Sequence, residues 1–181
     1  MNENLTTIEC IQSIEKTHWL SCTCSNSTLF LTTNESGSSI FQFNLLSSFS
    51  FMKQWKPPQS CNYDELIHNI AYNNETLALI IEHKFNETMR IELRSSLTFD
   101  QLWSTKFYTT FYFEKWVNRI CLLKYDEWLV IDHRTSHLLH VSKDGKIKKK
   151  HTYQTSVNNA VLFGTNALAI KTAKCVNFYR V

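Results

Sequence analysis

The sequence is poor in the two residues that most often punctuate a chain, and it lacks long apolar runs. Its 181 residues include only 3 Gly and 2 Pro, so Asn, Asp and Ser are expected to make most turns. No apolar run approaches the roughly 18 residues of a transmembrane helix, and the first residues lack the basic start and apolar stretch of a secretory signal. These absences predict a cytoplasmic location, with the nucleus as the alternative, and no membrane partner.

Catalytic and metal-binding motifs are absent as well. The sequence has no Gly-x-Ser-x-Gly elbow, no glycine-rich phosphate loop and no His-Glu-x-x-His pair. Among the 6 cysteines only Cys22 and Cys24 lie close together, and their spacing differs from that of a zinc knuckle. We interpret both as small core residues of a reduced protein. A soft-metal site is the alternative, because both would face one side of a strand. No cofactor is predicted.

What the sequence does have is the composition of a folded domain. Apolar residues make up 43%, aromatic residues 13% and charged residues 19%, a balance that excludes disordered, collagenous and coiled-coil chains. A chain of this length can bury about 70% of its unfolded surface, so we expect a single domain over residues 1–181. The net charge of +3 is too mild to imply nucleic acid by itself.

Similar segments recur along the chain. Each contains an apolar anchor with an apolar residue two positions later and another seven positions earlier, and an Asn or Asp stands shortly before the anchor. Asn and Asp favour tight turns, and alternating apolar residues mark strands, so each segment is interpreted as strand, turn, strand. The anchors are Leu29, Leu77, Leu129 and Leu168, and the residues seven positions earlier are Cys22, Ile70, Leu122 and Val161.

The spacing of these anchors predicts the fold. They lie about 40 to 50 residues apart, the length of a four-stranded propeller blade with variable loops. We therefore predict an all-β, β-propeller-like domain of four repeat units of antiparallel strands, approximately 15–57, 63–108, 116–154 and 157–181. Third strands are expected at Ile40–Leu45, Met89–Leu93, Leu138–Val141 and Cys175–Tyr179, and fourth strands at Phe49–Trp55, Gln101–Phe107 and Lys146–Tyr153.

The closure of the ring is left to another segment, because no fourth strand follows Cys175–Tyr179 in the sequence. The N-terminal segment Leu5–Ile14 (5–14) has strand character and is the candidate to supply it, which would remove an exposed sheet edge. Self-association of two copies to complete a ring is an alternative. Two other folds stay open, a mixed α+β domain, since Asp64–Ile70 has a helical pattern, and a β-sandwich.

One segment carries a family resemblance. Trp128–Lys148 consists of an apolar strand ending in Asp132, a short polar turn and a second strand closed by Asp144-Gly145, a pair that favours a tight hairpin. It resembles an NHL-type propeller repeat over 21 residues, whereas Ile80, Lys171 and Thr32 replace Asp132 in the other segments. The resemblance implies a docking platform for proteins or RNA, often joined to RING and B-box zinc modules. This chain lacks the Cys/His series of such modules.

These features predict a non-catalytic macromolecule-binding scaffold that contacts proteins through the propeller loops. Aromatic and arginine side chains anchor such interfaces, and loops commonly carry the binding residues. The candidate protein-binding residues are Tyr112, Trp116, Arg119, Arg134 and His137. The sequence does not identify the protein partner.

A basic stretch gives an alternative function. Lys146, Lys148, Lys149 and Lys150 precede His151, and such a cluster can contact RNA phosphates or resemble a nuclear-localisation patch. Aromatic residues in the preceding loop could stack bases, which would make an RNA-binding propeller. The simplest interpretation is an exposed outer strand whose lysines block edge pairing.

A second alternative is a metal-dependent propeller hydrolase. Its candidate carboxylates are the strand-end residues Glu82, Asp100 and Asp132, which do not recur in register. His133 and His137 flank a predicted turn and would need a further ligand to hold a metal. We therefore predict no enzymatic activity and no bound metal.

Overall fold

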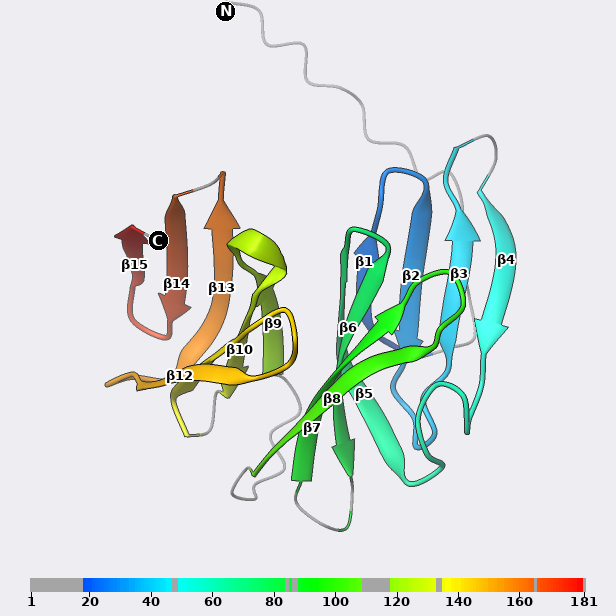
Figure 1. Ribbon diagram of the computed structural model, residues 1–181, viewed down its shortest axis with the longest axis horizontal. Coiled ribbons are helices and arrows are strands. Elements are labelled where there is room, and N and C mark those ends of the chain that lie inside the picture. Colours follow the sequence, from blue (N-terminus) through cyan, green and yellow to red (C-terminus); the bar gives the residue numbers. More distant parts are fainter. Residues whose placement is uncertain are drawn as a thin grey trace, which may run out of the picture.

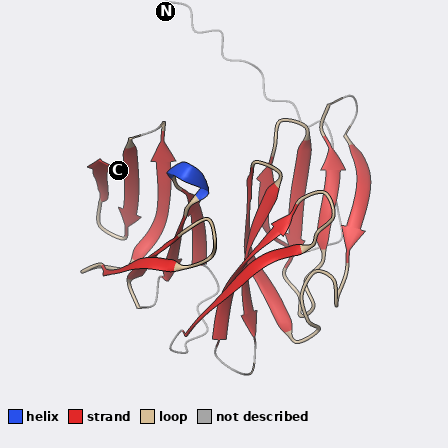
Figure 2. Cartoon of the chain, viewed as in Figure 1, coloured by secondary structure: helices blue, strands red, loops and turns tan. Residues whose placement is uncertain are grey.

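The computed structural model describes residues 18–46, 49–83, 85, 88–108, 118–132, 135–164 and 166–180, with the backbone alone at 108, 118 and 119. Within these ranges the regular structure is β apart from one short 3-10 helix, Lys124–Asp126 (Figure 2). No helix in them is long and apolar enough to cross a membrane. The strands are β1 (Trp19–Cys24), β2 (Thr28–Thr33), β3 (Ile40–Asn44), β4 (Ser50–Trp55), β5 (Glu65–Asn73), β6 (Thr76–His83), β7 (Thr88–Ser95), β8 (Gln101–Tyr108), β9 (Asn118–Leu122), β10 (Trp128–Asp132), β11 (His137–Val141), β12 (Ile147–Thr152), β13 (Val157–Phe163), β14 (Ala167–Thr172) and β15 (Val176–Arg180).

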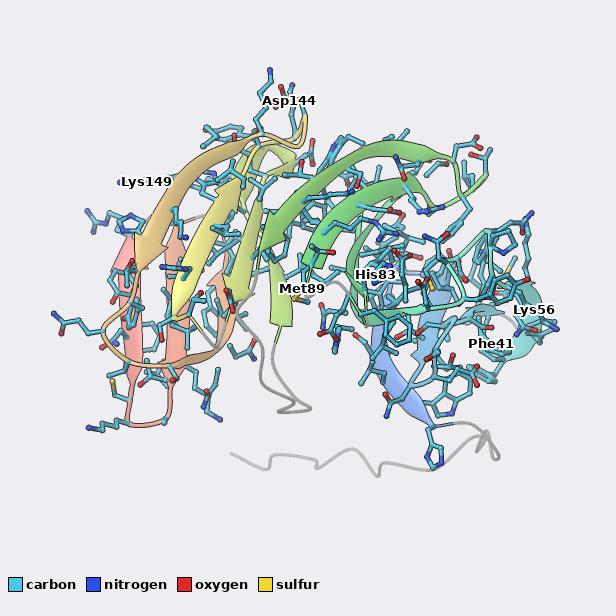
Figure 3. All side chains as sticks on the ribbon, turned by 90° about the horizontal axis from the view of Figure 1, so that it is seen from below. Phe41, Lys56, His83, Met89, Asp144 and Lys149 are labelled. Carbon is cyan, nitrogen blue, oxygen red and sulfur yellow. The ribbon has the colours of Figure 1, made fainter. Side chains whose placement is uncertain are left out.

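Consecutive strands form four antiparallel sheets, which we call blades. Blade 1 consists of β1–β4, blade 2 of β5–β8, blade 3 of β9–β12 and blade 4 of β13–β15. The blades follow one another in an arc, with blade 1 and blade 4 at its two ends (Figures 1 and 3). The prediction of an all-β, propeller-like fold with four repeat units is therefore confirmed. The β-sandwich alternative is wrong, because four sheets pack in series.

The strand predictions agree with the structure, and the helical alternative is wrong. All four anchor leucines lie in the second strand of their blade. Asp64–Ile70 is not helical, since β5 begins at Glu65. A β-bulge between Ile67 and Asn69 adds one residue to this strand, so Ile67 and Ile70 face the same side and both join one core. Their spacing of three imitates a helix.

The predicted alignment of first strands is right in two blades and wrong in the other two. Cys22 pairs with Leu31 and Ile70 pairs with Leu79, each two residues after its anchor. In blade 4, however, Val161 pairs with Ala169, one residue after the anchor. In blade 3, Leu122 pairs with Trp128, which precedes Leu129. The cause is turn length, which differs between the hairpins and shifts each register by its own amount.

Equivalent positions can be assigned from the side that each residue faces. Leu77 and Leu79 face blade 1, and Leu168 and Ile170 face blade 3. In blade 3 the residues that face the preceding blade are Trp128 and Val130, whereas the anchor Leu129 joins the core shared with blade 4. The anchor of this blade is therefore displaced by one residue, and Trp128 is the true counterpart of Leu77.

Three apolar cores lie between successive blades. The first joins blades 1 and 2 and includes Phe30, Trp55 and Leu79. The second joins blades 2 and 3 around Ile80 and Trp128, and the third joins blades 3 and 4. A blade in the middle of the arc must therefore be apolar on both faces, which explains why the whole run 77–81 is buried.

The predicted closing strand lies outside the described residues. The structure pairs β15 with β14 and with no other described strand. Pairing of Leu5–Ile14 with this edge therefore stays a prediction, as does the division of the chain into a single domain.

Candidate interaction surfaces

Most of the predicted protein-binding residues fall where the structure gives no side chain. Tyr112, Trp116 and Arg134 lie outside the described residues, and Arg119 contributes only its backbone to β9. His137 is half-buried at the start of β11, where its backbone pairs with Thr152 of β12. The predicted loop surface therefore stays a prediction.

The predicted basic strand is present and is exposed along its whole length. It forms β12 and the turn before it, at the outer edge of blade 3. Two of its lysines bind carboxylates of the same blade: Lys146 lies 2.8 Å from Asp144, and Lys148 lies 2.7 Å from Glu127. The hydrogen bond from Lys146 lowers the pKa of Asp144 to about 2. Part of the positive charge is thus compensated locally. Asp144 and Lys149 are labelled in Figure 3.

An open cleft, which sequence reasoning missed, lies between blades 3 and 4. It encloses about 560 Å³ and is lined by residues of β12 on one side and β15 on the other. Its apolar floor contains Leu129 and Leu138 from blade 3, and Leu168 and Ile170 from blade 4. Blade 4 has three strands among the described residues, and no local motif in the sequence marks the cleft beside them.

The cleft exists because β12 faces no fourth strand among the described residues of blade 4. The junction between blades 2 and 3 has a fourth strand on both sides, β8 in blade 2 and β12 in blade 3. Phe107 and Trp103 of β8 pack in the core of this junction. There the Trp103 Nε1–H donates a 2.7 Å hydrogen bond to the carbonyl of Lys143, and the Thr105 hydroxyl donates one to the carbonyl of Gly145. Between blades 3 and 4, no strand of the described residues fills the corresponding space.

Charges around the cleft are mostly positive. Its lining includes Lys124, Lys149 and Arg180, and Glu127 is the one carboxylate there. Glu127 is already engaged, since it accepts hydrogen bonds from Lys148 and from His140 Nε2 at 2.6 Å. These two partners, Lys148 first, lower the pKa of Glu127 and keep it ionised. The cleft therefore offers an apolar floor with a cationic rim.

Two tyrosines also line the cleft, Tyr153 directly after β12 and Tyr179 in β15. The hydroxyls of Tyr153 and Tyr179 are hydrogen-bonded to each other, and the Asn177 amide donates a 2.8 Å bond to the Tyr153 oxygen. The bond to Tyr153 raises the pKa of Tyr179 to about 12, so its hydroxyl stays a neutral donor and acceptor over the physiological range.

The densest charge cluster in the described residues is structural. Arg90 binds both buried carboxylates, Glu65 and Glu92, and Arg94 binds Glu92 at 2.6 Å. Burial would raise the pKa of Glu65, but hydrogen bonds from Arg90 and Asn62 outweigh it and lower the pKa. All four side chains of this network belong to blade 2, and they are paired within it, so they serve the fold.

The hydrolase candidates do not form one site. Glu82 is hydrogen-bonded to His68 on the neighbouring strand. Asp132 caps the turn after β10 by accepting bonds from the Thr135 hydroxyl and amide. His133 lies outside the described residues. Within the parts of the chain that the structure describes, no three His, Cys, Asp or Glu side chains are placed to hold a metal.

The cysteines divide into two groups. Cys61 and Cys121 are buried, and burial raises the pKa of each thiol to about 11. Cys22 and Cys24 are exposed, so the prediction that they are core residues is wrong. They lie in β1, at the end of the arc, where the described residues supply no covering blade.

Comparisons with known proteins show the fold and no family. No family model matches the sequence, and neither does any curated protein. The WD40 domain of Pan2 from Neurospora crassa gives a TM-score of 0.62 at 12% identity over 90% of this chain and 46% of that one. A protein of unknown function from Bacteroides caccae gives 0.61 at 11% identity over 88% and 56%. The chain thus spans about half the length of both.

One similar structure has the size of this chain. The computationally designed protein Ika4 gives a TM-score of 0.59 at 10% identity and aligns over 100% of this chain and 99% of that one. At such identities the likeness extends to the fold alone. It agrees with a four-blade propeller arrangement and leaves the NHL resemblance without support.

Proposed function

We propose that this protein is a non-catalytic scaffold that binds another protein, and that the cleft between β12 and β15 is its binding site. A propeller fold hosts many functions, so the argument depends on the site. The observation that carries it is the combination of an apolar floor, a cationic rim and a β15 edge that no described strand covers. Such an edge accepts an extended segment by strand addition.

The chemistry of the cleft specifies the segment. A bound strand would form main-chain hydrogen bonds with β15, and every second side chain of this strand would enter the cleft. Apolar side chains suit the floor formed by Leu138 and Leu168, while acidic ones suit Lys149 and Arg180 at the rim. The preferred partner is therefore an extended protein segment whose cleft-facing side chains include both apolar and acidic residues.

A peptide-binding measurement tests this proposal. The probe is a fluorescein-labelled ten-residue peptide built on the repeat Leu-Leu-Glu-Glu, which places both residue types on each face of a strand. It is titrated with the full chain and followed by fluorescence anisotropy. The comparison peptide has Lys in place of Glu. Because the rim is cationic, we expect the acidic peptide to bind at least about tenfold more tightly, and its affinity to fall as salt screens the rim.

Matched variants keep the test specific. Lys149→Glu with Arg180→Glu reverses two rim charges and should abolish the preference for the acidic peptide. Lys143→Glu with Lys174→Glu makes the same net change at exposed lysines outside the cleft and should leave the preference intact. Equal binding of both peptides, or equal effects of both double variants, would refute the cleft as the site.

The exposed lysines of β12 favour a second candidate, single-stranded RNA. Lys149 and Lys150 lie side by side on a strand that is exposed throughout. Phosphate binding through such residues makes the logarithm of affinity fall linearly with the logarithm of salt concentration. Polyuridylate titrated over several salt concentrations gives this slope. Lys150→Glu should reduce it, and a probe that does not bind at low salt removes this candidate.

A further inference from the structure

The two ends of the arc present sheet faces that resemble the interior of the molecule. We call the face of a blade directed toward the preceding blade in the sequence its backward face, and the opposite face its forward face. At each junction inside the arc, the forward face of one blade packs on the backward face of the next. The backward face of blade 1 and the forward face of blade 4 are covered by no blade among the described residues (Figure 3). Their composition shows what would cover them.

The backward face of blade 1 uses the positions that are cores elsewhere. Leu29 and Leu31 of β2 stand where Leu77 and Leu79 of blade 2 are fully buried. The same positions in blades 3 and 4 are also buried, as Trp128, Val130, Leu168 and Ile170. Leu29 and Leu31 are only half-buried. Blade 1 thus carries the residue pattern of a core, but no blade among the described residues packs on this face.

Aromatic residues also contribute to this face. Phe41 packs edge-on against Trp19 with ring centroids 5.2 Å apart, and Phe51 contacts both Phe41 and Phe43. Phe51 is 58% exposed. Exposed apolar surfaces of this kind on a soluble protein mark contact sites.

The forward face of blade 4 shows the same mismatch. Val176 pairs with Lys171, as Ile40 pairs with Thr32, Ile91 with Ile80, and Leu138 with Ile131. The three counterparts of Val176 are 0%, 0% and 6% exposed, whereas Val176 is 50% exposed. Val161, Phe163 and Phe178 add apolar surface to this blade, at 44%, 55% and 71% exposure.

The two faces carry the residues that would be needed to pack on each other in the way that the three existing junctions pack. The first core includes Ile40 with Leu79, the second Ile91 with Val130, and the third Leu138 with Ile170. Each pair joins the third strand of one blade to the second strand of the next. The pair that would continue the series is Val176 with Leu31. They belong to β15 and β2, in the blades at the two ends of the arc (Figure 1).

We propose that a second copy of this chain completes the ring. Blade 4 of each copy packs on blade 1 of the other, so a two-fold axis generates two identical junctions and leaves neither face exposed. The chain's span of about half of two larger structures of similar fold supports a ring of twice its blades. Each new junction would bring Val176 of one copy against Leu31 of the other. The cleft between blades 3 and 4 lies within one copy and is independent of this proposal.

Native mass spectrometry and analytical ultracentrifugation of the full chain test it. At low micromolar concentration we expect a particle of twice the 21.3 kDa chain mass. Leu31→Lys or Val176→Glu alone buries a charge at both junctions and should weaken the dimer at least about a hundredfold. Both substitutions lie on half-buried or exposed positions, so the monomers should keep the circular dichroism of a β protein.

Mixing the two variants separates ring closure from other association. In the mixed pair one junction is wild type and the other places the introduced lysine against the introduced glutamate, so a one-to-one heterodimer should reappear. Lys174→Glu, at an exposed position on the same blade, should leave the dimer unchanged. A wild-type chain that stays monomeric, larger open-ended assemblies, or variants that do not recover on mixing would each overturn the proposal.

Discussion

Blades 2 and 4 have their first three strands in the same antiparallel order but in different surroundings. In β6 the five residues 77–81 are all fully buried, because blades 1 and 3 cover both faces of the strand. In β14 the equivalent run is 168–172, and Lys171 there is exposed where blade 2 has Ile80. The strand order is thus the same in both blades, while the residues on each face differ according to whether another blade of the same chain packs on that face. This difference predicts where substitutions are costly.

The largest effect is expected at Ile80. Ile80→Ala removes three heavy atoms from the core between blades 2 and 3 and leaves a cavity, which should lower the free energy of unfolding by about 2–5 kcal/mol. The equivalent change in blade 4, Lys171→Ala, removes a side chain that is exposed in a single copy. At a concentration where the chain is monomeric, this change should alter the free energy of unfolding by no more than about 0.5 kcal/mol. Urea unfolding of both variants at one protein concentration measures the difference. Similar losses in both variants would show that the two blades are not surrounded differently.

A second matched pair of substitutions compares two turns. Gly145 lies in the β11–β12 turn of blade 3, and Gly164 lies in the β13–β14 turn of blade 4. Gly145 has φ +83°, and an added Cβ would lie 2.8 Å from the Trp103 ring of blade 2. Gly164 has φ +54°, but a Cβ there would meet nothing within 4 Å. Alanine is strained by positive φ in both turns, at about 1–2 kcal/mol. At Gly145 the contact with Trp103 adds overpacking of about 1–3 kcal/mol.

Thermal unfolding of Gly145→Ala and Gly164→Ala should therefore give clearly different midpoints, with Gly145→Ala the lower. The double variant Gly145→Ala with Trp103→Ala is the control. It should not show the added cost of overpacking, because the indole is gone. If the Gly145→Ala penalty were the same with and without Trp103, strain from φ alone would account for it.

The turn at Gly145 also shows which features of the fold could be predicted from the sequence. Asp144-Gly145 predicted a hairpin by local chemistry, and alternation predicted the strands on both sides. The docking of this turn on Trp103 depends on contact between blades, which no local pattern encodes. The sequence pattern around Asp132 resembled a family repeat. In the structure this side chain caps its own turn by accepting hydrogen bonds from Thr135.

The strand register and the cleft could not be predicted from the sequence, because neither is set by a local sequence pattern. Pairing of first and second strands depends on the length of each turn, and the 3-10 helix before β10 displaced blade 3 by one residue. The cleft depends on a strand that is missing from the described part of blade 4, and a missing partner leaves no motif. The candidate loop residues Tyr112 and Trp116 lie outside the described residues, so their role stays a prediction.

The buried charge network distinguishes blade 2 from blade 4 by its response to pH. Glu92 pairs with Leu79, and at the equivalent position in blade 4 the neutral Asn177 pairs with Ile170. Because the pKa of Glu65 is lowered in the folded state, its ionised form stabilises the fold above its unfolded pKa. That contribution is lost as the pH falls through the folded pKa.

Glu65→Gln should therefore cost about 1.5–3 kcal/mol at neutral pH, the range for a hydrogen bond to a charged group. The difference from the wild type should shrink on acidification below pH 4.5, the ordinary value for this carboxyl. Asn177→Ala in blade 4 serves as the control and should show a pH-independent difference. Unfolding in guanidinium at a series of pH values measures both. A Glu65→Gln penalty that stays constant down to acid pH would contradict the assigned role.

The smallest effect is expected on the outer strand of blade 3. Lys148 is half exposed, and its 2.7 Å pair with Glu127 lies beside solvent. An exposed pair of this kind contributes about 0–1 kcal/mol, so Lys148→Met should hardly change the urea midpoint, in contrast to Ile80→Ala. The variant should nevertheless raise the pKa of Glu127, because Lys148 is the first cause of its lowering. Carbon-detected NMR titration of the Glu127 carboxyl reads this directly. A carboxyl pKa that does not move would mean that His140 alone holds Glu127 ionised.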